Sequence, residues 1–220
     1  MKSLLAVTAL IAMVPFGSRA QEPRLGSVDF STSAEGTAHS LFLRGVLFLH
    51  SFEYQAAADA FRKAQAADPE FAMAYWGEAM TYNHALWNER DRARAVDVLA
   101  RLAPMPSVRR AMAPTERERM FLDAVETLWA EGPKAERDTA YSEAMADLVR
   151  AFPDDVEARA FYALSLMGLS QGVRVIPTYM RAGAIALEIL RDHPDHPGAA
   201  HYVIHAFDDP IHAPIALPAA

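Results

Sequence analysis

The sequence lacks cysteine altogether, has little glycine and is short of positive charge. It contains no Cys and 10 Gly among 220 residues. Without cysteine the chain has no disulfide, no thiolate metal ligand and no thiol nucleophile, so any metal must be held by nitrogen and oxygen. The 21 basic residues against 28 acidic ones give a net charge of −7. This balance argues against nucleic acid or an anionic membrane surface as the main partner.

Apolar runs long enough to suggest a targeting segment occur only at the start of the chain. A basic residue at Lys2 precedes an apolar stretch from Leu4 to Phe16, and small residues follow up to Ala20. This order is typical of a secretory signal peptide over residues 1–20, and the stretch is too short to span a bilayer. We therefore expect cleavage after Ala20 and a periplasmic or secreted protein with an N-terminal extension over 21–37. A buried N-terminal helix is the less favoured alternative.

An internal repeat organises the rest of the chain. In its first unit, small residues such as Gly45 and Ala57 stand where two antiparallel helices must approach closely, and Phe48 and Phe61 fill the space beside them. Asp68-Pro69 ends the second helix, because proline disfavours helical geometry in the preceding residue. The positions that carry the pattern are Leu41, Gly45, Phe48, Ala57, Phe61, Ala64 and Pro69.

Similar units follow along the chain. The second begins 34 residues later, at Ala72. The helices expected after it, with the start of the fifth unit, are 91–102, a first helix from Thr115 with a capping signal, 139–152, 156–170, 176–194 and Pro197 onward. The fold class predicted is therefore all-α, a right-handed α-solenoid of about four and a half helix-turn-helix units over residues 38–220. Because the fifth unit lacks most of its second helix, we expect the natural chain to continue past Ala220. The alternative is that the tail pairs with another chain.

The seven positions of the first unit resemble the tetratricopeptide repeat (TPR). The strings from Phe48 to Trp87 and from His193 to Pro214 are similar to a group of secreted bacterial TPR proteins in which histidine-bearing first helices recur. The resemblance covers most of residues 41–214. It implies an α-helical solenoid outside the cytoplasm and a longer natural chain, and it transfers no activity and no catalytic residues.

Histidines suggest a metal site. His50 and His84 lie one repeat apart, and His201 and His205 are spaced i, i+4, so the second pair shares a helix face and could chelate a divalent metal such as Zn or Cu. The predicted metal ligands are His50, His84, His201 and His205, with a further ligand from Glu53, Glu78, His84, Asp208, Asp209, His196 or His212. In the alternative interpretation these histidines bond to backbone or carboxylate groups, or pack beside Tyr202 and Phe207.

Other polar and aromatic groups are expected on the concave face of the solenoid. These candidate binding residues are Arg44, Tyr54, Glu78, Asn83, His84 and Trp87. Arg44 and Glu78 occupy equivalent places in successive units, so an ion pair that staples the stack is the alternative for them.

No complete catalytic constellation is present, and HYVIH lacks the glutamate of zinc-protease helices. The function predicted is a scaffold that binds a peptide, a protein partner or a small ligand. The alternatives are a metal-binding protein or metal-dependent enzyme, and a histidine pH sensor.

Overall fold

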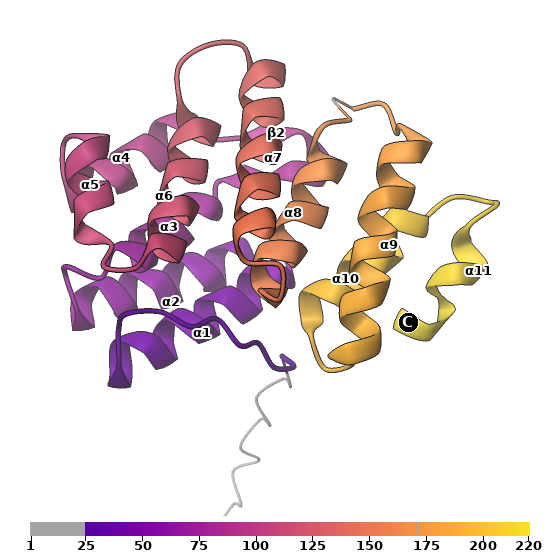
Figure 1. The fold of residues 1–220 in the computed structure, drawn as a ribbon, viewed down its shortest axis with the longest axis horizontal. Coiled ribbons are helices and arrows are strands. Elements are labelled where there is room, and N and C mark those ends of the chain that lie inside the picture. The colour runs from indigo at the N-terminus through magenta and orange to yellow at the C-terminus, as the bar shows by residue number, and fades with distance from the viewer. Residues whose placement is uncertain (1–24, 171) are drawn as a thin grey trace, which may run out of the picture.

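The computed structural model describes residues 25–170 and 172–220, and this part of the chain is almost entirely helical (Figure 1). The predicted all-α class is confirmed. The helices are α1 (Gly36–His50), α2 (Tyr54–Ala67), α3 (Ala72–Met80), α4 (Arg92–Leu102), α5 (Pro106–Met112), α6 (Glu116–Trp129), α7 (Lys134–Ala151), α8 (Val156–Gly168), α9 (Ile176–Asp192), α10 (Pro197–Phe207) and α11 (Ala213–Ala216). Short 3₁₀ turns, η1 (Ala85–Trp87) and η2 (Leu217–Ala219), complete them.

Helices that follow one another in sequence pack against one another in most cases. This holds from α1 to α4 and again from α6 to α10, and α3 packs on α6 between the two groups. In Figure 1 the later helices α9, α10 and α11 lie together at one end of the molecule. The chain also closes on itself, because α10 contacts α1 as well as α8 and α9. Segments about 150 residues apart therefore meet, and the candidate site lies at this junction.

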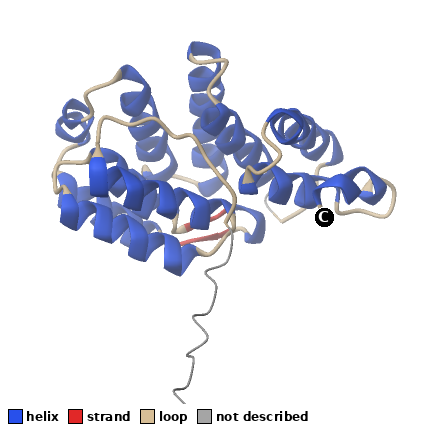
Figure 2. Cartoon of the chain, turned by 90° about the horizontal axis from the view of Figure 1, so that it is seen from below, coloured by secondary structure: helices blue, strands red, loops and turns tan. Residues whose placement is uncertain are grey.

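A small hairpin interrupts the helices between α3 and α4. Strands β1 (Asn83–His84) and β2 (Glu89–Arg90) pair antiparallel, with Asn83 opposite Arg90 and His84 opposite Glu89. Figure 2 shows these two strands in red among the helices. Asn88, in the connection, has a φ of 58°, the left-handed geometry that asparagine tolerates better than most residues. Asn83, His84 and Trp87 were expected within one helical turn of the second unit, but α3 ends at Met80 and they lie in β1 and η1 instead.

Most other predicted helix boundaries agree with the structure, but the predicted start of α7 is wrong. The prediction began a helix at Thr139, but α7 begins at Lys134, just after Pro133. Lys134, Ala135, Glu136 and Arg137 are good helix formers, and Lys134 forms an ion pair with Asp138 one turn later. Of the predicted insertion over residues 131–138, residues 134–138 are therefore the start of the helix. Helix α5 was not predicted at all.

The described part of the N-terminal extension packs into the core. Phe30 is 1% exposed, and its ring centre lies 5.0 Å from those of both Phe42 and Phe121. The Arg117 guanidinium lies 4.3 Å from the centre of the Phe30 ring and donates a hydrogen bond to the Ser31 carbonyl at 2.7 Å. The extension thus joins α1 to α6. The predicted signal peptide, residues 1–20, lies outside the described residues, and no helix in the described ranges is long and apolar enough to cross a membrane.

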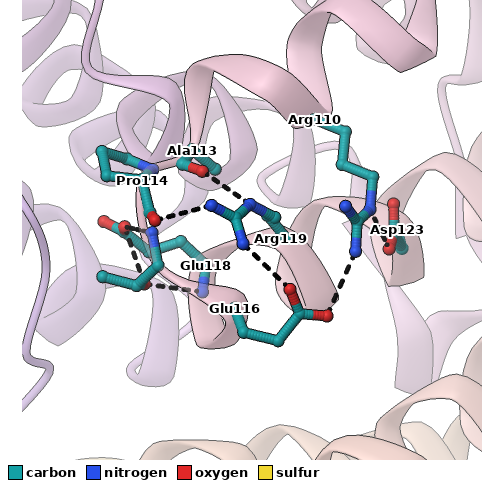
Figure 3. Close-up of polar contacts among 8 residues, drawn as sticks. Arg110, Ala113, Pro114, Glu116, Glu118, Arg119 and Asp123 are labelled. Carbon is teal, nitrogen blue, oxygen red and sulfur yellow. Dashed lines mark hydrogen bonds and ion pairs between the residues drawn. The ribbon is translucent and has the colours of Figure 1, made fainter.

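The start of α6 carries the capping signal that the sequence predicted. Thr115 and Glu118 form a reciprocal capping box, and Glu118 also accepts a hydrogen bond from the Ser33 backbone N–H at 2.8 Å. Figure 3 shows the Glu116 carboxylate between Arg110 and Arg119, with Arg110 also paired to Asp123. These contacts fix the entry to α6 and connect it to α5 and the N-terminal extension.

Close packing of the first three helices depends on two glycines and one phenylalanine. The Phe61 ring of α2 lies between Gly45 of α1 and Gly77 of α3, where an added Cβ would come within 2.5 Å and 2.3 Å of the ring. Phe61 is completely buried. The small residue expected at position 45 is therefore required because an aromatic ring occupies the space of its missing side chain.

Gly77→Ala should destabilise the fold by about 1–3 kcal/mol, because the new methyl group overlaps the buried Phe61 ring. Urea unfolding measures the effect. Combining Gly77→Ala with Phe61→Leu should cost less than the sum of the two single changes, since the smaller side chain makes room for the methyl group. Additive costs would contradict this explanation.

Candidate functional site

A group of partly exposed aromatic and imidazole rings gathers around Phe52. We call Phe52, Tyr54, His84, Trp87, His201 and His205 the aromatic–histidine face. The ring centre of Phe52 lies 5.7 Å from Tyr54, 5.5 Å from Trp87, 4.2 Å from His201 and 5.7 Å from His205. The rings come from the α1–α2 turn, the start of α2, the β1–η1 segment and α10. Such a set of aromatic rings is suited to anchoring a ligand.

Phe52 has a strained backbone conformation. Its φ is 59°, in the left-handed region where a bulky side chain is an outlier that costs about 1–3 kcal/mol. The conformation continues the chain from α1 into α2 while directing the ring against Tyr202 as well as the face. A strained backbone conformation persists only where surrounding contacts hold it in place. Here the Phe52 ring contacts four other rings of the aromatic–histidine face and Tyr202, and these contacts stabilise the conformation.

The hairpin side of the face consists of stacked rings beside a groove. Tyr54 and His84 stack with ring centres 3.9 Å apart, and burial is the main cause that raises the pKa of Tyr54 above its ordinary value. His84 Nε2 lies 3.1 Å from the Thr81 carbonyl oxygen, which orients its ring. A groove of about 460 Å³ borders this stack, with Tyr82 and the arginines Arg62, Arg90 and Arg94 among its lining residues. Its volume is within the range of small-ligand sites.

Trp87 is the most exposed member of the face. Its side chain is 53% exposed, and its ring lies edge-on to both Phe52 and His205. The other tryptophans, Trp76 and Trp129, are 1% and 2% exposed. A large apolar ring left open to solvent beside other rings is the usual form of an anchor for a bound molecule.

The two histidines of α10 face each other. Their Nε2 atoms lie 3.1 Å apart. His201 Nδ1 lies 2.9 Å from the His50 carbonyl oxygen, and since a carbonyl only accepts, Nδ1 carries the proton. The Nε2 of neutral His201 is then an acceptor, and His205 Nε2–H donates to it. Burial lowers the pKa of both His201 and His205, which favours these neutral forms.

A second, fully buried group of histidines lies behind this face. His50 Nε2 lies 2.7 Å from one Glu157 carboxylate oxygen and His196 Nε2 lies 3.2 Å from the other, while His50 Nδ1 lies 2.8 Å from the Tyr202 hydroxyl. Within the described ranges, His50, Glu157 and His196 are the group of three potential metal ligands whose atoms approach within 4.8 Å of one another. They join α1, α8 and the start of α10.

The pattern of hydrogen-bond donors and acceptors in the buried group favours a structural network over a metal site. The Ala199 backbone N–H donates to His196 Nδ1 at 3.0 Å, so Nδ1 has no proton and the neutral ring carries it on Nε2, directed at Glu157. A neutral histidine that binds a metal through Nε2 needs the opposite tautomer. His196 caps α10 in this way, so its proton cannot move from Nε2 to Nδ1 to free Nε2 for a metal unless the cap is lost.

The electrostatics of the network are consistent with this assignment. Burial alone would raise the pKa of Glu157, but attraction to His50 and hydrogen bonds from His196 and His50 outweigh it and lower the pKa to about 2. Burial lowers the pKa of His50, which keeps its ring neutral. Glu157 also lies in the first turn of α8, where the helix dipole favours a negative charge. A single carboxylate anion is thus held by two imidazole N–H groups.

The structure separates the four predicted metal ligands into three places. His201 and His205 lie together, His50 belongs to the buried network, and His84 stacks on Tyr54. Of the residues suggested as a further ligand, His196 joins His50 through Glu157. His212 instead bonds to Asp209 at 2.8 Å. Glu157 and Phe52 were not predicted from the sequence. An acid in the first turn of a helix is ordinarily explained by the dipole, and phenylalanine is not a residue expected at positive φ.

The predicted binding residues also divide. Tyr54, His84 and Trp87 lie on the aromatic–histidine face, whereas Glu78 and Asn83 are buried. Glu78 accepts a hydrogen bond from Gln65 at 2.7 Å and pairs with Arg101 and, at 3.8 Å, with Arg62. The Arg44 guanidinium lies 5.4 Å from the centre of the Phe48 ring. Glu78 therefore connects α3 to α2 and α4 through Arg62 and Arg101, whereas the pair expected was with Arg44.

Glu157→Gln should destabilise the fold at neutral pH by an amount on the order of 3 kcal/mol, because the amide cannot accept two imidazole N–H groups as the carboxylate does. The folded-state pKa of Glu157 lies below its ordinary 4.5. Its ionised form therefore stabilises the wild type above about pH 4.5, and that contribution is lost as the pH falls toward 2. Urea unfolding at several pH values should show this loss in the wild type and not in the variant.

Glu131→Gln, at an exposed carboxylate in the α6–α7 turn, is the matched control. It should leave both the stability and its acid dependence close to those of the wild type. An equal pH dependence in Glu157→Gln and the wild type would contradict the assignment of an ionised Glu157.

Comparisons with known proteins give no relative. No protein-family model matches the sequence, and neither a curated protein nor a solved structure matches it. The function must therefore be inferred from the side chains of the site itself.

Proposed function

We propose that this chain is a binding module of the tetratricopeptide-repeat type that holds a peptide or small ligand on its aromatic–histidine face. The observation that carries the proposal is the set of partly exposed rings from four separate segments around the strained Phe52. Antiparallel helix packing around Gly45 and Phe61, with units 34 residues apart, supports the repeat assignment. A right-handed solenoid remains part of this proposal.

The contacts of the polar groups on the aromatic–histidine face suit a binding role without catalysis. His84 is oriented by a backbone carbonyl and a stacked ring, and His201 by the His50 carbonyl. A candidate nucleophile activated by an adjacent base is not among the contacts of the face. Aromatic rings that supply contact area, together with imidazoles that donate or accept single hydrogen bonds, are instead the usual components of a recognition surface.

A library of random peptides displayed on phage and selected on the whole protein tests the proposal. Trp87→Ala should weaken the binding of each selected peptide by at least about tenfold, since an exposed aromatic anchor contributes about 1.4 kcal/mol or more. Affinity is measured by titration with synthetic peptides.

Leu217→Ala is the matched control, because Leu217 is a large apolar residue that is 72% exposed and lies outside the face. Its effect on affinity should be small. Failure to enrich any peptide, or equal losses in the two variants, would count against the face as the binding site.

The proposed compartment is the periplasm or the exterior of the cell. We expect the exported chain to begin at Gln21, as N-terminal sequencing or intact mass would show. Leu10→Arg places a charge in the apolar stretch of the proposed signal and should keep the chain at full length in the cytoplasm. Export of an uncleaved wild-type chain, or unchanged processing of the variant, would refute the signal peptide.

A further inference from the structure

The geometry points to a binding site for a divalent transition-metal ion, Cu(II) or Zn(II), between His201 Nε2 and His205 Nε2. The inference deepens the proposed function, since the ion would sit on the same aromatic–histidine face. Two nitrogens bound to one metal at about 2.1 Å, with angles of 90° to 109°, lie about 3.0–3.4 Å apart. The observed separation is 3.1 Å. The pair therefore already has the spacing of two ligands on one ion.

The surroundings of His201 are those of a metal ligand. Its Nδ1–H donates to the His50 carbonyl, so its Nε2 lone pair is directed at the site. Histidines that bind metals typically donate their other ring N–H to a carbonyl or carboxylate in this way, which fixes tautomer and orientation. His196 lacks this arrangement, because its Nδ1 accepts a hydrogen bond and its Nε2 therefore carries the proton. Of the two histidine groups, the partly exposed one has the lone pair that a metal needs.

Binding of an ion requires one proton to move and none to leave. In the metal-free chain His205 Nε2 carries the proton of the contact with His201. When the ion takes both Nε2 lone pairs, that proton is transferred through solvent to His205 Nδ1, so both rings stay neutral. His205 is partly exposed, which gives water a path to the ring.

The two histidines would fill only part of the coordination sphere of the ion. In the described part of the chain, His201 and His205 do not belong to a group of three potential ligand residues. Two protein nitrogens leave coordination positions for water or for a donor atom of the bound ligand. Structural metal sites, in contrast, usually have all their positions filled by protein ligands. Neutral imidazoles favour Cu(II) over Zn(II) and give Mg(II) no advantage. Trp87, with its ring centre 6.2 Å from that of His205, lies beside the expected ion.

The tautomers provide the first test, on the wild-type protein alone. Long-range ¹⁵N–¹H spectra of the histidine rings should show His201 as the Nδ1–H tautomer and His205 as the Nε2–H tautomer. Adding ZnCl₂ to one equivalent should convert His205 to Nδ1–H and shift these two rings before any other. An Nε2–H tautomer at His201, or earlier shifts at His84 or His193, would overturn the assignment.

The second test measures affinity with CuCl₂. Cu(II) should quench the fluorescence of Trp87 with a stoichiometry of one ion per chain, and Trp87→Phe should abolish most of the quenching because the other tryptophans are buried. His201→Ala and His205→Gln should each weaken Cu(II) binding by at least about tenfold, since removal of a ligand costs no less than removal of its outer partner. His193→Ala, a histidine at the end of α9, is the control and should bind as the wild type does.

The outcomes separate the inference from the proposed function. If both histidine variants keep the Cu(II) response of the wild type while selected peptides still require Trp87, the metal site is refuted. The peptide-binding proposal is then unaffected. A Cu(II) response that depends on His201 and His205 in a protein that selects no peptide would do the reverse. MgCl₂ should produce no change, and quenching by Mg(II) equal to that by Cu(II) would contradict imidazole coordination.

Discussion

The buried carboxylate of Glu157 is the contact on which the arrangement of the candidate site depends. It brings together His50 at the end of α1 and His196 at the start of α10, although these residues are 146 positions apart in the sequence. A charge removed from water is costly unless every lone pair is satisfied. Two imidazole N–H groups and the N-terminal turn of α8 provide that compensation. Replacing any one of the three partners would leave the others buried and unsatisfied.

The aromatic–histidine face follows from this junction. Because α10 is held against the end of α1, His201 can donate to the His50 carbonyl and Phe52 can lie 4.2 Å from the His201 ring. The positive φ of Phe52 is affordable only in that setting, where Tyr202 packs on one side and Trp87 on another. The buried network thus determines where the exposed rings lie.

Much of the fold could be predicted from the sequence because helices leave local signals. Thr115 and Glu118 mark the start of α6, and Gly45 marks the close approach to Phe61. Where the local signals conflict, the prediction was wrong. Residues 131–138, which contain Gly132 and Pro133, were interpreted as an insertion, but the helix formers from Lys134 onward begin α7 at once. The hairpin of β1 and β2 is too short to show a period of two.

The site was less predictable, because its members are selected by tertiary contact rather than by spacing. The i, i+4 spacing of His201 and His205 did identify a pair that meets, since that relation is local to one helix. The repeat spacing of His50 and His84 did not bring them together, because one side chain turns into the core and the other stacks on Tyr54.

What distinguishes the two histidine groups is the partner of the second ring nitrogen. His196 accepts from a backbone N–H and so must direct a proton at Glu157, whereas His201 donates to a backbone carbonyl and so directs a lone pair at His205. A histidine side chain thus serves as a structural hydrogen-bond donor at position 196 and as a candidate metal ligand at position 201. The backbone atom opposite Nδ1 decides between these roles. For His196 it is the Ala199 N–H of α10 itself, and for His201 it is the His50 carbonyl of α1.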